Sequence, residues 1–115
     1  MKKVSKKQKR ERRHARIRAR VFGTHDMPRL SVFKSNTYIS AQLIDDTVGT
    51  TLASSHSTAV TGATLLARSA MVGHDIAKKA IAQKITRIVF DRGGYMYTGC
   101  VAALADGARK EGLQF

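Results

Sequence analysis

The sequence predicts an α/β protein of the α+β type, in which a basic N-terminal arm precedes strands and helices in the order βββαβα. Three observations support this prediction. Apolar and polar residues alternate between residues 29 and 54, as in strands with one buried face. Apolar residues recur every three or four positions over residues 61–83 and again after residue 99, as in helices. Basic residues are concentrated in residues 1–20.

The uneven charge divides the 115-residue chain, whose formal net charge is +13, into two parts. Residues 1–20 hold eleven Lys and Arg and one acid, Glu11, whereas the rest holds ten basic and seven acidic residues. A segment that repels itself and has few apolar side chains cannot offset its ordering entropy by burial. We therefore expect residues 1–22 to be a flexible or helical arm that binds nucleic acid, and residues 23–115 to be a single globular domain.

The segment after the arm predicts an antiparallel meander of three strands. Leu30 and Val32 are the apolar positions of the first strand, and alternate apolar residues from Ile39 onward mark the second. Residues 35–37 favour a hairpin turn, and residues 50–54 form a weaker third strand after a second turn. The side chains expected on the outward face of the hairpin are polar, basic and aromatic: Arg29, Ser31, Phe33, Tyr38, Ser40 and Gln42.

The second half of the chain predicts a helix, a strand and a final helix. Residues 61–83 form the first helix, with Gly73 as a point of close packing. Residues 85–90 are short, apolar and β-branched, as in a strand buried on both faces, and residues 91–97 form a loop. A helix that crosses between the third and fourth strands predicts a mixed four-stranded sheet with the helices packed on one face. The final helix has one apolar face, formed by Val101, Leu104, Ala105 and Ala108.

The loop at residues 92–95 and the uncovered face of the sheet are candidate RNA-binding surfaces. Two glycines let the backbone approach a phosphate or a base closely, and Arg92 and Tyr95 offer a charge and a stacking plane. A pair of glycines also occurs simply as a tight turn, and Tyr95 and Tyr97 can cap the core. Taken alone, this motif leaves both interpretations open.

Catalysis and metal binding are not expected from these residues. A two-metal nuclease needs several convergent carboxylates, and the acids near expected strand ends are Asp45, Asp46 and Asp91. The adjacent Asp45 and Asp46 are more simply explained as solvated turn residues. The four histidines lack the paired spacing of a metal site. Cys100 is the only cysteine, which excludes an internal disulfide. We expect no catalytic residue, no metal, no cofactor and no small-molecule substrate.

No membrane partner is expected either. The apolar stretches are far shorter than the roughly 18 residues of a membrane span, and no secretory apolar segment follows the basic N-terminus. We expect a soluble cytoplasmic protein. An organellar location stays open, because residues 1–20 partly match a transit peptide.

Five blocks of the sequence, in order, carry a resemblance to a known family: MPRLSVFKSN (27–36), YISAQLIDD (38–46), TLAS (51–54), VFDRGGY (89–95) and ALADGAR (103–109). Together with Gly112, Leu113 and Phe115, they resemble the eighteenth protein of the bacterial large ribosomal subunit. The resemblance implies a ribosomal protein that catalyses nothing, binds 5S rRNA, attaches it to 23S rRNA and helps form the central protuberance. It also implies neighbouring large-subunit proteins as partners, namely the fifth and, in some bacteria, the twenty-fifth.

The charge pattern, the outward face and the loop motif select most of the candidate RNA-binding residues, and the resemblance implies the same regions and adds Lys34, Ser35 and Asn36. The full set of candidates is Lys6, Lys7, Lys9, Arg10, Arg12, Arg13, His14, Arg16, Arg18, Arg20, Arg29, Ser31, Phe33, Lys34, Ser35, Asn36, Tyr38, Arg92, Gly93, Gly94 and Tyr95. The chain departs from the family pattern at Met27, Lys84 and Cys100, and Cys100 stands where a basic residue is usual. Two rivals remain: a general nucleic-acid chaperone or DNA-binding protein, and a small metal-dependent nuclease.

Overall fold

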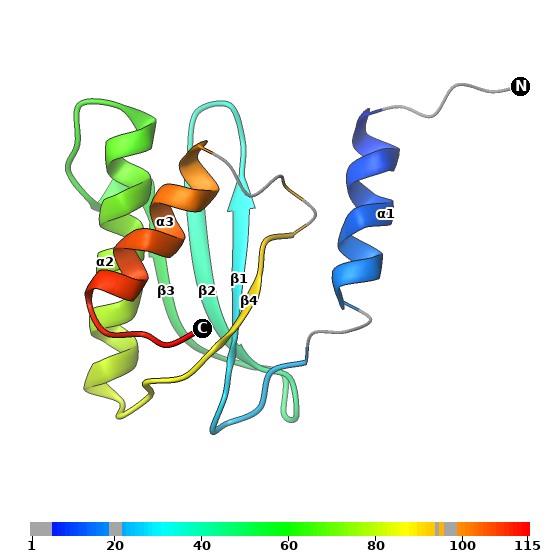
Figure 1. Ribbon diagram of the computed structural model, residues 1–115, viewed down its shortest axis with the longest axis vertical. Coiled ribbons are helices and arrows are strands. Elements are labelled where there is room, and N and C mark those ends of the chain that lie inside the picture. Colours follow the sequence, from blue (N-terminus) through cyan, green and yellow to red (C-terminus); the bar gives the residue numbers. More distant parts are fainter. Residues whose placement is uncertain (1–5, 19–21, 94, 96–98) are drawn as a thin grey trace, which may run out of the picture.

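A mixed four-stranded sheet with two helices against one face forms the body of the protein, as expected (Figure 1). The structure is a computed structural model, and it describes residues 6–18, 22–93, 95 and 99–115. For residues 14–18 it describes the backbone only. The elements in chain order are α1 (Lys6–Arg18), β1 (Arg29–Lys34), β2 (Ile39–Asp45), β3 (Thr50–His56), the 3-10 turn η1 (Ser57–Ala59), α2 (Leu65–Ala82), β4 (Val89–Asp91) and α3 (Gly99–Lys110).

The strands lie in the order β3-β2-β1-β4. β1 pairs antiparallel with β2, in a register that sets Leu30 opposite Leu43, and parallel with β4. β2 pairs antiparallel with β3, and the register shifts between Leu43 and Ile44. Antiparallel neighbours need only short turns, whereas the parallel pairing of β4 with β1 requires the crossover that α2 provides.

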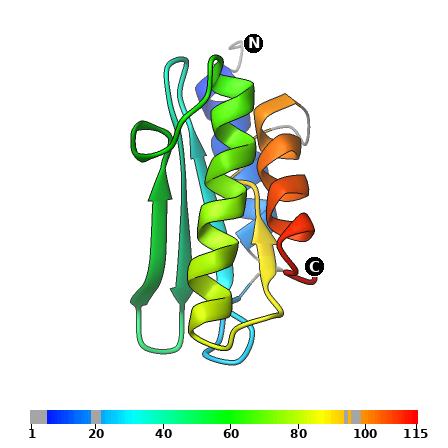
Figure 2. The same cartoon turned by 90° about the vertical axis from the view of Figure 1, so that its left-hand side faces the viewer.

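The core lies between the sheet and the two helices. Figure 2, turned by 90° from Figure 1, shows α2 and α3 beside each other along the sheet. Burial of these apolar side chains is the main favourable contribution to folding. The sheet contributes alternate residues of each strand, and the helices contribute one face each. The buried apolar cluster consists of Leu30, Val32, Ile39, Ala41, Leu43, Val72, Ile76, Ala77, Ala80, Ile85, Ile88, Val101, Leu104, Ala108 and Leu113.

The first long helix is shorter than predicted, because Thr64 caps it. The Thr64 hydroxyl accepts a hydrogen bond from the backbone N–H of Ala67 at 3.2 Å, so the helix begins at Leu65 rather than at residue 61. The expected close packing at Gly73 is confirmed. A Cβ at this position would lie 2.0 Å from the carbonyl oxygen of Leu104, so only glycine lets α2 approach α3 this closely.

The prediction that residues 85–90 form a strand buried on both faces is wrong. β4 spans only Val89–Asp91, lies at the edge of the sheet, and exposes part of Val89 and Phe90. The backbone groups just before β4 form hydrogen bonds with the C-terminal tail instead. Gln114 donates from its N–H to the carbonyl of Thr86 at 2.8 Å and accepts from the N–H of Ile88 at 3.2 Å. The tail is a partner that no local pattern in residues 85–90 could reveal.

Residues 6–18 of the arm form α1, the helical one of the two expected conformations. In Figure 1, α1 stands on the β4 side of the sheet, apart from α2 and α3. The guanidinium carbon of Arg10 lies 5.1 Å from the ring centroid of Tyr95. The arm therefore meets the body at the loop that follows β4.

Candidate nucleic-acid interface

The face of the sheet opposite α2 and α3 carries exposed aromatic and polar side chains. Because Leu30 and Val32 point into the core, Ser31 and Phe33 of β1 point the other way. The ring of Phe33 is 50% exposed and that of Tyr38 is 37% exposed. Ser40 and Gln42 of β2 lie opposite Phe33 and Ser31 in the register, so they share this face. The outward orientation predicted for these residues is confirmed.

Four aromatic rings form a continuous row across this face, which we call the ring row: His56, Tyr38, Phe33 and Tyr95. The rings of Tyr38 and His56 are stacked, with centroids 4.9 Å apart. Phe33 lies 6.0 Å from Tyr38 and meets Tyr95 edge to face at 6.4 Å. Such spacings are those of favourable aromatic pairs. The row brings together residues of the β1–β2 hairpin, the end of β3 and the loop after β4.

His56 is a member of the ring row that sequence reasoning missed. The third strand was expected to end at Ser54, but β3 continues to His56, which pairs with Ser40 and so shares its face. The backbone N–H of Thr58 donates to Nδ1 of His56 at 3.1 Å, which fixes the ring at the start of the 3-10 turn. Extending the alternation of the third strand by two residues would have placed this histidine beside Tyr38.

A hollow of about 200 Å³ lies where α1 faces the ring row. Its walls combine two aromatic rings with a hydroxyl, a guanidinium and a carboxylate. Groups of this kind can stack on a base and form hydrogen bonds with its edge. The hollow is lined by Arg10, Glu11, Ser31, Val32, Phe33, Gly93 and Tyr95.

At the tip of the hairpin, Lys34 is partly exposed and Asn36 is exposed. Ser35 has a different role, because its hydroxyl accepts from the N–H groups of Thr37 and Tyr38 at 3.3 Å and 3.2 Å. Ser35 therefore shapes the turn that carries its two neighbours.

The basic side chains of the arm form a second surface. Lys6, Lys7, Lys9 and Arg12 are exposed on α1, and Arg10 and Arg13 are half-buried. The side chains of His14, Arg16 and Arg18, and the whole of Arg20 and Gly94, lie outside the described residues. In the loop after β4, Arg92 is partly exposed and Gly93 is buried with a φ of +66°.

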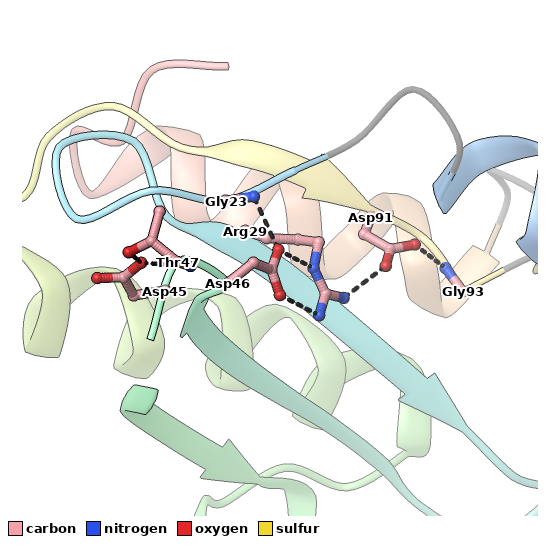
Figure 3. A network of polar contacts seen from close by, with 7 residues as sticks. All are labelled: Gly23, Arg29, Asp45, Asp46, Thr47, Asp91 and Gly93. Carbon is pink, nitrogen blue, oxygen red and sulfur yellow. Dashed lines mark hydrogen bonds and ion pairs between the residues drawn. The ribbon is translucent and has the colours of Figure 1, made fainter. Parts of the chain in front are cut away.

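The expectation that Arg29 points outward to an RNA phosphate is wrong. Arg29 is only 5% exposed, and its guanidinium is held between two carboxylates. It donates to Asp46 from Nε at 2.9 Å and from Nη2 at 3.1 Å, and to Asp91 from Nη1 at 2.7 Å (Figure 3). The hydrogen bonds to Asp46 raise the pKa of Arg29, burial opposes the rise, and Asp91 adds to it. Residues 22–28 join the arm to β1, and we call them the linker. At Gly23 the linker covers this end of the face, which alternation along β1 alone could not indicate.

The expectation that Asp45 and Asp46 are solvated turn residues is wrong, because both side chains are largely buried. Asp46 and Asp91 bind Arg29, and Asp45 is buried and accepts from the N–H of Thr47 at 3.0 Å. Within the described ranges, no three His, Cys, Asp or Glu side chains are placed to hold a metal ion. The carboxylates that a nuclease would need serve structural hydrogen bonds instead.

The helices described here include none that is long and apolar enough to span a membrane.

Comparisons with known proteins identify the family of this chain. Residues 4–115 match the family described as "Ribosomal L18 of archaea, bacteria, mitoch. and chloroplast". The chain is 51% identical over 113 residues to the large ribosomal subunit protein uL18 of Lactococcus lactis subsp. lactis, covering 98% of this chain and 97% of that protein. It is 48% identical over 115 residues to the uL18 of Pediococcus pentosaceus, covering 98% of both.

A third relative is similar over the same range. The chain is 48% identical over 120 residues to the large ribosomal subunit protein uL18c of Cyanophora paradoxa, covering 98% of this chain and 99% of that protein. The family match and the relatives extend over nearly the whole sequence. This chain therefore belongs to the L18 family of ribosomal proteins, which are structural components of the large ribosomal subunit and not enzymes.

Proposed function

We propose that this protein binds 5S rRNA and helps attach it to 23S rRNA in the central protuberance of the large ribosomal subunit. The observation that carries the proposal is the ring row on the open face of the sheet, bordered by the basic helix α1. Exposed rings offer stacking planes to unpaired bases, and clustered Lys and Arg attract phosphates. Binding requires no chemistry from the protein.

The arm, residues 1–22, supplies attraction that depends little on RNA sequence. Each phosphate that its side chains neutralise releases counterions, so affinity falls as salt rises, with a log–log slope of roughly 0.7 to 0.9 per contact. The RNA-binding residues proposed here are Lys6, Lys7, Lys9, Arg10, Arg12, Arg13, His14, Arg16, Arg18 and Arg20.

The globular domain, residues 23–115, supplies selectivity. Rings that stack on bases and polar groups that bond to base edges and 2′-hydroxyls distinguish one RNA shape from another. The proposed contact residues are Ser31, Phe33, Lys34, Ser35, Asn36, Tyr38, Arg92, Gly93, Gly94 and Tyr95, to which the structure adds His56 as a neighbour of Tyr38. Arg29 is left out because it is buried.

Neighbouring proteins complete the proposed assembly. We infer contacts with the fifth large-subunit protein and, in some bacteria, the twenty-fifth, because the family resemblance implies them. Pull-down of each purified neighbour by the complex of this protein with 5S rRNA tests the inference, and failure of both to bind would contradict it.

Equilibrium binding to 5S rRNA and to tRNA, each titrated from low to physiological salt, tests the proposal. We expect binding to 5S rRNA to survive at salt concentrations where binding to tRNA is lost. The double variant Arg92→Ala, Tyr95→Ala should lose this preference, whereas the control Lys110→Ala, on exposed α3 surface, should keep it.

The same experiment tests the rival function. Equal affinities and equal salt slopes for both RNAs in the unaltered protein would indicate a general nucleic-acid chaperone, in which the arm alone binds. If the double variant without Arg92 and Tyr95 keeps its preference for 5S rRNA, the loop is not part of the contact surface.

A further inference from the structure

We propose that Arg29 is a positioning residue for RNA binding: its buried guanidinium holds the loop after β4 and the linker from the arm in fixed positions. This inference rests on the proposed function. It assigns to Arg29 a role through other residues rather than through contact with RNA.

The guanidinium joins two segments that are far apart in the sequence. Arg29 of β1 reaches Asp46, which follows β2, and Asp91, the last residue of β4, which is fully buried (Figure 3). Arg29 and Asp91 are 62 positions apart. A planar guanidinium can donate in two directions at once, which a lysine ammonium on a flexible stem does less well.

From Asp91, the connection continues into the loop. The Asp91 Oδ2 accepts from Arg29, while its Oδ1 accepts from the backbone N–H of Gly93 at 2.9 Å. Gly93 has a φ of +66°, and the N–H of Tyr95 donates to the carbonyl of Arg92 at 3.1 Å. The carboxylate thus fixes the turn that sets Arg92 and the ring of Tyr95 beside the open face.

From Asp46, a second connection continues into the linker. The backbone N–H of Gly23 donates to Asp46 Oδ2 at 2.8 Å, and the Gly23 carbonyl accepts from the N–H of Asp46 at 2.9 Å. A Cβ at position 23 would lie 2.4 Å from the Arg29 nitrogen and 2.6 Å from the Ile44 oxygen, so the backbone at Gly23 lies in close contact with β1 and β2. Gly23, at the start of the globular domain, is therefore held in a fixed position.

This arrangement stabilises the binding conformation before RNA arrives. A loop that is ordered in the free protein loses less entropy on binding, which increases affinity for the RNA that fits it. The arm's attraction for phosphates does not depend on this order. Loss of the guanidinium should therefore reduce affinity for 5S rRNA and leave affinity for tRNA unchanged.

Two variants test the inference. Single loss of Arg29 would remove the guanidinium from the buried carboxylate of Asp91 and the largely buried one of Asp46, and would endanger folding. Arg29→Lys keeps the charge but not the planar fork. The triple variant Arg29→Met, Asp46→Asn, Asp91→Asn removes all three buried charges while keeping side-chain oxygens as acceptors. Arg87→Met, at an exposed position, is the control.

The measurements are binding to 5S rRNA and tRNA over a salt series, and hydrogen exchange of the Gly93 amide in the absence of RNA. In variants that show cooperative thermal unfolding, we expect about a tenfold loss of affinity for 5S rRNA, because the loop must be ordered during binding. The salt slope should stay unchanged and Gly93 should exchange faster.

Unaltered affinity for 5S rRNA in either folded variant would overturn the inference. A fall of about one in the salt slope of the triple variant would also overturn it, because that result indicates a direct phosphate contact. If the unaltered protein itself showed no preference for 5S rRNA, the proposed function would fail. The Gly93 exchange rates would still show whether Arg29 orders the loop.

Discussion

The rings of Tyr38 and His56 lie stacked with centroids 4.9 Å apart and planes inclined by 30°, and the contact joins the start of β2 to the end of β3. Tyr38 in turn lies beside Phe33. Stacking orders both rings, and an ordered ring loses less entropy when a base stacks on it. The pairing of β3 with β2 therefore extends the ring row as far as His56.

Replacing Phe33 with Ala should weaken binding to 5S rRNA. The ring is half exposed, and stacking on a base contributes roughly 1–3 kcal/mol, so affinity should fall about 5- to 150-fold. Fluorescence anisotropy with labelled 5S rRNA measures the change. Leu66→Ala on α2 is the control, because Leu66 is equally exposed at 52% and lies on the helical layer. Equal losses in both variants would argue against stacking.

Replacing His56 with Ala should have a smaller effect in the same direction. The variant removes one ring and the cap on Thr58, and the ring pair itself contributes about 0.5–1.5 kcal/mol. We expect a loss of affinity for 5S rRNA smaller than that of Phe33→Ala, with tRNA binding unchanged. His56→Phe keeps a ring and should restore binding. If His56→Phe does not restore binding, the hydrogen bond from Thr58 to His56, and not the ring, is what RNA binding requires.

Neutralising three lysines of α1 should change the salt dependence without changing selectivity. If Lys6, Lys7 and Lys9 each meet a phosphate, their replacement by Gln should lower the log–log salt slope by about 2 to 3 in total. The ratio of affinities for 5S rRNA and tRNA should persist. Replacing Lys78, Lys84 and Lys110 with Gln removes the same charge from exposed positions elsewhere. An equal change in slope in this control would assign the effect to net charge.

Gly73→Ala should destabilise the fold. The added Cβ would lie 2.0 Å from the carbonyl oxygen of Leu104, so α2 and α3 must move apart, at a cost of about 1–3 kcal/mol. Thermal unfolding monitored by circular dichroism should show a lower Tm. Lys78→Ala, at an exposed position of α2, should change stability by less than about 0.5 kcal/mol. An unchanged Tm for Gly73→Ala would mean that the helices separate at no cost.

Restoring a basic residue at Cys100 should strengthen RNA binding. Cys100 is half-buried near the start of α3. The family resemblance implies a basic side chain at this position. We expect Cys100→Arg to raise affinity for 5S rRNA and to increase the salt slope by about 0.7 to 0.9, as one added phosphate contact would. Cys100→Ser controls for loss of the thiol. A slope equal to that of the unaltered protein would show that position 100 does not reach the RNA.

Local patterns were sufficient to predict much of this protein. Alternation from Leu30 onward indicated the hairpin and its two faces, because the strand period is two wherever one face is buried. Helical spacing around Gly73 indicated α2 and a point of close packing, and the structure shows that α3 is the partner there. The charge of the first 20 residues indicated a polyanion partner, since net charge is a property of composition and needs no fold.

Other features depended on contacts between distant segments. Arg29 looked like an outward basic residue, yet Asp46, Asp91 and the linker at Gly23 enclose it. His56 looked like an isolated surface residue, yet the register of β3 sets it against Tyr38. The sequence by itself determined the elements, the buried faces and the basic arm, because these follow from local periodicity and composition. Only the tertiary structure decided which charges are buried and which rings meet, because both depend on partners brought together by the chain's long-range pairing.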